Sequence, residues 1–356
     1  MRFREFRGFL ALAALTGLWL AAPEARSQAL TIDGETIADA SLYAAAKKEG
    51  KLLIYGVIPS DTYDGLKEGF EKDTGIKVEI VRLPTQGLYA RTISEFAAGK
   101  LEADFVDLSE PPLLKDLMDK GILNKPHKVP SFDRLPADVK DPQGRWYAEI
   151  RQVQTIGVNT AVVKEADIPK SWKDLLDPKW KGGKIGMGTI DAGGAHFVLQ
   201  NYLKEVIDKD FWPKLAAQAP RVYPSVAPAM TNLARGEVSI GLAAAGSILD
   251  QIDKGAPLKA IFPSEGTASF FVGGGITSTA KNPNAAALFL NYYTSKRGGQ
   301  AISPKGVYAS HPDAPLPSAK GLTYPSLDKV WFMDVDRWMR DREASMAEWR
   351  TTFAVK

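Results

Sequence analysis

Short apolar runs alternate with amphipathic stretches along most of the chain. Runs rich in branched and aromatic residues at 51–57, 77–83 and 103–108 are typical of buried strands, and a polar turn follows each of them. The stretches at 63–73 and 88–98 have the spacing of amphipathic helices, and another helix is expected between Pro112 and Gly121. Strands that alternate with helices predict parallel βαβ units, so the fold class is α/β.

The second half of the chain repeats this alternation. Strands are predicted near 184–187 and 236–243, and helices at 195–207, 229–235 and 248–254. At the C-terminus a helix is predicted over 328–353. Trp331, Val335, Trp338 and Trp349 would form one apolar stripe on it and pack the C-terminus onto the core.

One extended segment is unusually long. The sequence WYAEIRQVQTIGVN, which starts at Trp146, contains branched and aromatic residues and no proline. A strand is typically about 5–6 residues long, so a segment of this length suits a connection that runs out of one sheet and into another. A short helix is expected after it, from Trp172 to Leu176, with Ser171 as its N-cap.

Several motifs around this segment resemble one known family. They are SWKDLLDPKWKGGKI after Lys170, EGKLLIY, FEKDTGIKVE, GKLEADFVDL and ARGEVSIGL. Together they resemble the periplasmic solute-binding proteins of ABC importers, in the ferric-binding-protein-like branch of extracellular solute-binding family 1. That branch also holds binders of phosphonates, sugar phosphates, thiamine and polyamines. The resemblance covers roughly residues 40–310.

The resemblance implies a two-lobed type II periplasmic binding protein fold, in which two crossover strands join two mostly parallel sheets flanked by helices. The first lobe would contain residues 30–150 and 270–356, and the second lobe residues 151–269. The hinge crossings would lie near 146–158 and 262–278. The implied partners are a small-molecule solute and an inner-membrane ABC permease with its ATPase, and the protein is expected to be a monomer.

Residues 1–29 are predicted to be a cleavable signal peptide, and the mature protein is expected in the periplasm. Arginines precede an apolar run from Gly8 to Ala22, and Ser27-Gln28-Ala29 offers small residues for cleavage. An uncleaved N-terminal anchor is the alternative. Without this segment the formal charge falls from +3 to +1, which indicates no nucleic-acid partner. The chain has no cysteine, so it has no disulfide, thiolate metal site or lipoprotein anchor.

The candidate ligand site follows from the strand order. In open α/β sheets a ligand binds outside the carboxyl ends of the strands, where helix starts offer free N–H groups and partial positive charge. Each polar residue there has an alternative role as an ordinary N-cap. The candidate ligand-binding residues are Ile58, Pro59, Ser60, Gln86, Gly87, Ser109, Glu110, Arg151, Gln152, Thr189, Asp191, Ala192, Gly193, Ser225 and Ser247.

The charge of the solute is a separate question. Arg151 lies within the crossing segment and is either a guanidinium fork for a carboxylate or phosphate, or a structural partner of Glu149 or another group. We expect a small organic anion, such as a carboxylate, phosphonate or sugar phosphate. The acidic residues that keep a cationic or zwitterionic amine as an alternative are Asp61, Glu110, Asp191 and Glu265.

Direct binding of ferric iron is not expected. Ferric members of the resembled family carry a Tyr-Tyr pair after the strand that follows the A-R-G-E-V motif, where this chain has Ala243 to Gly246. Tyr292 and Tyr293 are adjacent but lie in a predicted core helix, and the three histidines show no metal-ligand spacing. Iron held without tyrosine is the remaining metal alternative. No metal or cofactor is predicted, and no nucleophile elbow or P-loop supports an enzyme.

Overall fold

A computed structural model describes residues 28–58, 60–190 and 194–354. The predicted signal peptide therefore lies almost entirely outside the described residues. The same is true of the candidate residues Pro59, Asp191, Ala192 and Gly193, and only the backbone of Ser60 is described. Among the described residues, no helix is long and apolar enough to cross a membrane.

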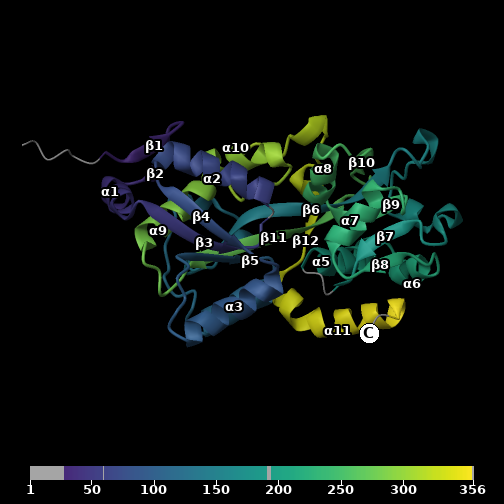
Figure 1. The fold of residues 1–356 in the computed structure, drawn as a ribbon, viewed down its shortest axis with the longest axis horizontal. Helices are drawn as coiled ribbons and strands as arrows, with labels where there is room; N and C mark the ends of the chain where they lie inside the picture. The colour runs from purple at the N-terminus through teal and green to yellow at the C-terminus, as the bar shows by residue number, and fades with distance from the viewer. Residues whose placement is uncertain (1–27, 59, 191–193, 355–356) are drawn as a thin grey trace, which may run out of the picture.

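One mixed sheet runs through the whole molecule (Figure 1). Along its main path the strands are, in order, β4 (Lys77–Arg82), β3 (Lys51–Gly56), β5 (Phe105–Leu108), β11 (Thr267–Ile276), β6 (Tyr147–Asn159), β9 (Ile240–Ala244), β7 (Ile185–Gly188) and β8 (Arg221–Tyr223). Two further strands pair beside this path: β10 (Leu258–Ile261) with β6, and β12 (Val330–Phe332) with β11. A separate antiparallel pair is formed by β1 (Leu30–Ile32) and β2 (Glu35–Ala38).

Strands β6 and β11 divide the sheet into two lobes. The first part of β6, Tyr147 to Val153, pairs with β11, whereas Gln154 to Asn159 pair with β9 and β10. Every residue of β6 is buried, which explains why the sequence of this strand is largely uncharged along both faces. We call the side with β3, β4 and β5 the first lobe, and the side with β7, β8, β9 and β10 the second lobe.

Helices cover both lobes. In the first lobe they are α1 (Ala40–Glu49), α2 (Ser60–Thr74), α3 (Thr85–Ala97), α4 (Pro111–Asp119), α9 (Pro283–Tyr293) and α10 (Lys296–Ile302). In the second lobe they are α5 (Gly194–Tyr202), α6 (Phe211–Ala216), α7 (Val226–Ala234) and α8 (Ala245–Asp253). Helix α1 begins where the Asp39 carboxylate accepts a hydrogen bond from Leu42 N at 2.8 Å, and it ends at Gly50, whose φ is 70°.

Short helical turns fill several connections. The 3₁₀ helices are η1 (Phe132–Arg134), η2 (Ala137–Val139), η3 (Glu165–Asp167), η4 (Lys173–Leu176), η5 (Pro178–Trp180), η8 (Ser303–Lys305), η9 (Ala319–Gly321) and η10 (Leu327–Lys329), and η7 (Leu203–Ile207) is a π-helix. Two predicted helices therefore differ from the structure. The helix expected after Ser171 is only the 3₁₀ turn η4, and the helix expected over 195–207 changes from α to π after Tyr202.

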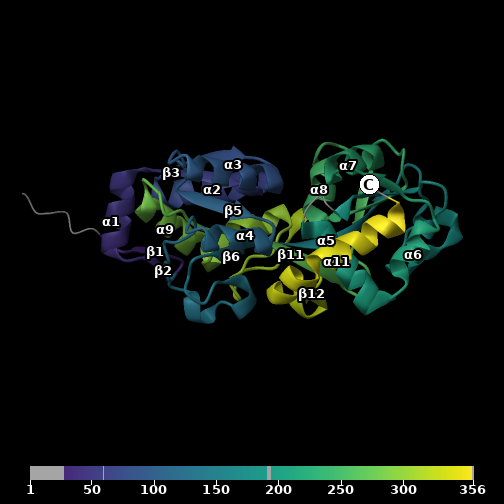
Figure 2. The same cartoon turned by 90° about the horizontal axis from the view of Figure 1, so that it is seen from below.

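The C-terminal helix differs most from its prediction. Helix α11 (Val335–Phe353) begins only after β12, because Val330–Phe332 pair with β11 instead of starting a helix, and Trp331 therefore lies on a strand. Asp334 caps α11 by accepting from Arg337 N at 2.8 Å. The helix packs against α4 of the first lobe and against α5 and α6 of the second (Figure 2). The prediction placed this segment in the first lobe alone.

Candidate ligand cleft

In the first lobe, helices begin along one edge of the sheet, which we call the first-lobe edge. Strands β4, β3 and β5 are parallel neighbours, so their carboxyl ends lie together, and α3 and α4 begin directly after β4 and β5. The polar side chains at this edge bind one another. The hydroxyls of Thr85 and Ser109 are 2.7 Å apart, and Gln86 Nε2 donates to Glu110 Oε1 at 3.1 Å. These four side chains therefore hydrogen-bond one another in two pairs, and each keeps further hydrogen-bonding capacity.

Two other candidates on the first lobe, Ile58 and Gly87, have no side-chain group that could hydrogen-bond a solute. The side chain of Ile58 is 1% exposed and belongs to the core, and its carbonyl accepts from Arg82 Nε at 2.9 Å. Gly87 lies in the first turn of α3, and no atom comes within 4 Å of a Cβ built on it. The side chain of Ile58 therefore packs into the core, whereas the space beside Gly87 in the first turn of α3 is open.

In the second lobe, helices likewise begin along one edge of the sheet, which we call the second-lobe edge. Strand β7 is parallel to both β8 and β9, so the starts of α5, α7 and α8 lie side by side. Thr189 N donates to Tyr223 O at 2.8 Å, which holds two of these strand ends together. Ser225 is the N-cap of α7, but its hydroxyl does not cap the helix, and Ser247 is half-buried in the first turn of α8. Free N–H groups and hydroxyls therefore gather at this edge.

Two buried polar side chains near the second-lobe edge have no hydrogen-bond partner. His196 is 7% exposed and neither ring nitrogen has a partner. Its Cε1 and Nε2 lie 2.8 Å from a Cβ built on Gly188, at the end of β7. Burial lowers the pKa of His196 to about 4, so the ring is neutral at pH 7. The amide of Gln154 on β6 is fully buried and also unpartnered. Unpaired groups of this kind are costly unless a ligand or water completes them.

The two edges touch each other. A Cβ built on Gly194, the first residue of α5, would lie 2.5 Å from Ser109 O and 2.8 Å from Trp338 Cη2. Only a residue without a side chain fits this position, which shows that the lobes are in close contact there. Gln152, on the crossing strand β6, lies near the start of α8, with Oε1 4.0 Å from a Cβ built on Gly246.

The candidate cation Arg151 is already paired. Its Nη2 lies 2.9 Å from Asp138 Oδ2, and its guanidinium lies 4.3 Å from the centre of the Phe332 ring. Its backbone exchanges hydrogen bonds with Tyr308 at 2.8 and 2.9 Å. Burial lowers the pKa of Arg151 while Asp138 raises it, and the side chain remains a cation at pH 7. The structural partner is Asp138 rather than Glu149.

The acidic residues of the amine alternative that the structure describes are engaged as well. Glu110 is 3% exposed and binds Gln86 with one oxygen and Arg342 Nη2, at 2.9 Å, with the other. Glu265 accepts from Trp172 N at 3.1 and 3.3 Å. Glu110 is therefore already neutralised by Arg342, whereas Glu265 is exposed and, among the described residues, has only the donors of Trp172 and Ser264 as partners.

The tyrosine pair of ferric proteins has no equivalent at the cleft. Ala243 and Ala244 end β9, and Ala245 and Gly246 begin α8, so small residues occupy this edge. Tyr292 and Tyr293 are fully buried in α9, where Tyr292 OH donates to Asp73 Oδ2 at 2.9 Å and Tyr293 OH donates to Tyr147 O at 3.3 Å. Over the described residues, no group of three or more His, Asp or Glu side chains could hold a metal.

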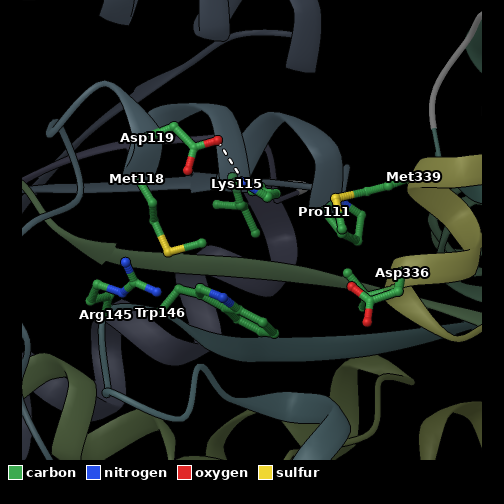
Figure 3. A pocket seen from close by; sticks show the side chains of 10 residues that line it. Pro111, Lys115, Met118, Asp119, Arg145, Trp146, Asp336 and Met339 are labelled. Carbon is green, nitrogen blue, oxygen red and sulfur yellow. Dashed lines mark hydrogen bonds and ion pairs between the residues drawn. The ribbon is translucent and has the colours of Figure 1, made fainter.

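A separate cavity lies beside the cleft, between α4 and the start of α11 (Figure 3). It has a volume of about 200 Å³, and Leu114, Met118, Trp146 and Met339 supply much of its apolar lining. Trp146 stacks on Phe271 with ring centres 5.3 Å apart. The helix start α4 and the C-terminal helix are therefore loosely packed against each other at this point.

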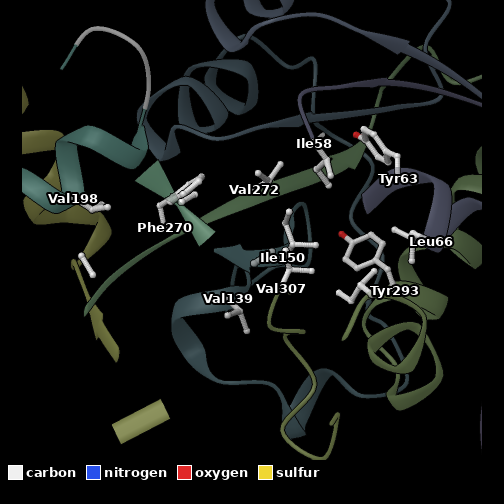
Figure 4. Close-up of a cluster of buried hydrophobic side chains, with 14 of the residues drawn as sticks. Ile58, Tyr63, Leu66, Val139, Ile150, Val198, Phe270, Val272, Tyr293 and Val307 are labelled. Atoms are coloured by element: carbon white, nitrogen blue, oxygen red, sulfur yellow. The ribbon is translucent and has the colours of Figure 1, made fainter. Parts of the chain in front are cut away.

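Two carboxylates are buried beneath the first-lobe edge. Asp107 accepts from Val57 N at 2.8 Å and from the hydroxyl of Tyr63, which Figure 4 shows beside Ile58. Glu149 lies on β6, is fully buried, and has no partner for either oxygen. Burial raises the pKa of Asp107 to about 7. Burial, and then the charge of Asp107, raise the pKa of Glu149 well above its ordinary value.

Sequence reasoning missed four residues that matter in this geometry: His196, Gln154, Trp338 and Arg342. His196 follows Gly194 at a helix start, and this position is a signal that could have been used. Trp338 was recognised only as an apolar side chain. Arg342 had no local signal, because its partner Glu110 is 232 residues away in the chain.

Comparison with known proteins identifies the class first. The two-lobed sheet is shared with the periplasmic binding protein AfuA of Actinobacillus pleuropneumoniae, solved with fructose-6-phosphate, at a TM-score of 0.70 and 22% identity. That match covers 86% of this chain and 100% of AfuA. The fold is thus a type II periplasmic binding protein, in which each lobe is a mostly parallel sheet flanked by helices, and crossover strands join the lobes.

The family follows from the sequence match. Residues 101–338 match the model of the bacterial extracellular solute-binding proteins, and the chain belongs to this family. The Fe(3+)-binding periplasmic protein of Serratia marcescens is 23% identical over 303 residues, covering 80% of this chain and 87% of the relative. Spermidine/putrescine-binding periplasmic protein 1 of Haemophilus influenzae is 27% identical over 299 residues, with 74% and 78% covered. The chain is a solute-binding protein and not an enzyme. Its relatives take iron, polyamines and a sugar phosphate, and so leave the solute class open.

Proposed function

We propose that the protein is the periplasmic solute-binding component of an ABC importer and that it captures a small organic anion between its lobes. It would deliver the anion to an inner-membrane permease with its ATPase, and work as a monomer. The observation that favours an anion is the second-lobe edge, where the starts of α5, α7 and α8 lie side by side. Helix N-termini supply N–H donors and partial positive charge for a phosphate or carboxylate.

The partners of the charged side chains near the cleft also favour an anionic solute. Glu110 and Glu265 already have partners, which weakens the case for an amine. Arg151 is paired with Asp138, so the anion would be held mainly by backbone N–H groups together with Gln152, Ser225 and Ser247. A neutral His196 beside Gly188 could add one hydrogen bond. Iron binding is disfavoured because Ala243 to Gly246 offer no phenolate at this edge.

The identity of the solute is tested by mass spectrometry of small molecules that co-purify with natively isolated protein, followed by calorimetric titration of the compound found. We expect a carboxylate or phosphorylated compound. The variant Ser225→Ala should weaken its binding about ten- to a hundredfold, since a charge-assisted hydrogen bond contributes roughly 1.5–3 kcal/mol.

The matched control is Ser94→Ala, which removes an exposed hydroxyl from the body of α3. Its affinity should equal that of the wild type. Recovery of a polyamine, or equal affinities in the Ser225 and Ser94 variants, would contradict the anion proposal. Recovery of stoichiometric iron would contradict it as well.

A further inference from the structure

Helix α11 is anchored firmly on the second lobe. Trp338 stacks on Phe197 of α5 with ring centres 5.1 Å apart and an interplanar angle of 22°. Gln200 Nε2 donates to Ser345 O at 2.9 Å, further along the same helix. The ion pairs Arg337–Glu205 and Lys204–Glu348 add to this contact. Aromatic packing together with several polar contacts makes α11 part of the second lobe in mechanical terms.

The contact of α11 with the first lobe has a different character. It contains the ion pair between Arg342 Nη2 and Glu110 Oε2, at 2.9 Å, and the apolar cavity of about 200 Å³ beside α4 (Figure 3). The side chain of Glu110 is 3% exposed and that of Arg342 is 24% exposed. Helices α4 and α11 also contact each other directly beside the cavity, and the ion pair adds an electrostatic attachment to this contact.

Glu110 also reaches the cleft. Its second oxygen accepts from Nε2 of Gln86, at the start of α3. One carboxylate therefore connects a residue at the mouth of the cleft with a helix that belongs to the other lobe. If the lobes separated, α11 would move with the second lobe, and Glu110 would lose its ion pair with Arg342. A buried charge without its partner is unfavourable, so this pair favours closed lobes.

We propose that Glu110 and Arg342 form an interlobe latch that biases the protein toward closure before solute arrives, with Glu110 as a positioning residue for Gln86. This inference rests on the proposed capture of a solute by lobe closure. When more of the solute-free protein is already closed, less binding free energy is used for closing, and the apparent affinity for the solute is higher. The latch thus sets affinity without touching the solute.

The test measures closure without any solute. Glu68 on α2 and Lys254 at the end of α8 are exposed, and the chain has no cysteine, so two introduced cysteines can carry spin labels. Pulsed electron–electron double resonance on solute-free protein should give a distance distribution in the parent that is dominated by a short population, with a minor long one. Arg342→Gln should add a longer distance population. The matched control Arg340→Gln removes a guanidinium whose ion pair, within the described part of the chain, is with the neighbouring Asp341, and it should leave the distribution unchanged.

Urea unfolding of the same proteins separates the latch from a general loss of structure. Arg342→Gln should keep the cooperativity of unfolding while its distances lengthen. Glu110→Gln retains a carbonyl acceptor for Gln86 and should lengthen the distances about as much as Arg342→Gln does. The double variant with both substitutions should lengthen them little further, because both remove the same ion pair. An unchanged distribution in both Arg342→Gln and Glu110→Gln would overturn the latch. Because no solute is present, that result would leave the proposed anion capture standing.

Discussion

At the scale of single residues, the surroundings decide what each charged side chain can do. Arg151, Glu110 and Glu265 are chemically suited to bind a solute, yet each is engaged by a neighbour from another part of the chain. His196 and Gln154 are the opposite case, since they are buried without partners. The groups with unmet hydrogen bonds, rather than those with formal charge, therefore indicate where a ligand would be bound.

Arg151 should contribute more to stability than to affinity. Replacing it with alanine removes the ion pair with Asp138 and the contact with the Phe332 ring. We expect a loss of about 1–2 kcal/mol in the free energy of unfolding, because Asp138 is half exposed and the pair is partly screened. Urea denaturation of solute-free Arg151→Ala measures this loss, and Arg151→Lys serves as a control that keeps the charge. A large loss of affinity with unchanged stability would show instead that Arg151 binds the solute.

The buried pair of Asp107 and Glu149 predicts a pH dependence of stability. Both carboxyls have a raised pKa in the folded protein, to about 7 for Asp107, compared with about 4 in an unfolded chain. The folded state therefore holds protons more tightly. The contribution of this pair to stability should therefore be largest below about pH 4 and be lost as the pH rises through about 7. Tyr63, Tyr293 and Arg82 are the other titratable groups that interact with this pair.

Urea denaturation between pH 5 and pH 8 measures this effect. Glu149→Gln removes one of the two carboxylates and should flatten the dependence, with the largest gain over the wild type above pH 7. The reverse trend, with wild-type stability rising between pH 5 and pH 8, would contradict the assignment of raised pKa values to this pair.

At the scale of elements, the helix starts form the proposed solute-binding edge and set how closely the lobes approach. The first-lobe starts pair their side chains with one another, as Thr85 does with Ser109, whereas Ser225 on the second lobe leaves its helix uncapped. The start of α5 contacts the end of β5 through Gly194. One element therefore contributes both to the proposed anion-binding edge and to the contact between the lobes.

The variant Gly194→Ala should separate closure from folding. Alanine stabilises a helix interior by about 1 kcal/mol relative to glycine, and this gain offsets part of the clash with Trp338 on the same lobe, so resistance to urea should fall only slightly. Its Cβ would collide with Ser109 O and the Trp338 ring, so the lobes should stay apart and solute affinity should drop. The control is Ser94→Ala, at an exposed position in the body of α3. Equal solute affinity in the Gly194 and Ser94 variants would show that the close contact is not needed for binding.

At the scale of the whole molecule, two crossing strands and one helix connect the lobes. The strands β6 and β11 pair with each other at the centre of the sheet, and α11 spans the same division on the outside. A hinge of continuous strands allows a rotation of the lobes without breaking either core. The molecule should therefore alternate between an open and a closed arrangement.

Small-angle X-ray scattering tests this motion. Saturation with the identified solute should lower the radius of gyration of the wild type, and the change should be larger for Arg342→Gln, which starts from a more open average. The hinge would be placed near 146–158 and 262–278, with α11 moving with the second lobe and not, as expected from the sequence, with the first lobe. A radius of gyration that does not change in either protein at saturation would argue for a rigid binding site.

The sequence by itself determined the alternation of strands and helices, the long crossing strand, the family resemblance and the edge where helix starts gather. These features depend on local periodicity, turn residues and contiguous motifs, which a linear chain displays directly. Only the tertiary structure decided that Arg151 pairs with Asp138, that Glu110 pairs with Arg342, and that α11 joins both lobes. The partner of a charge can be any complementary group that folding brings within about 4 Å, and Glu110 and Arg342 are 232 residues apart. Local patterns contain no information about such a pair.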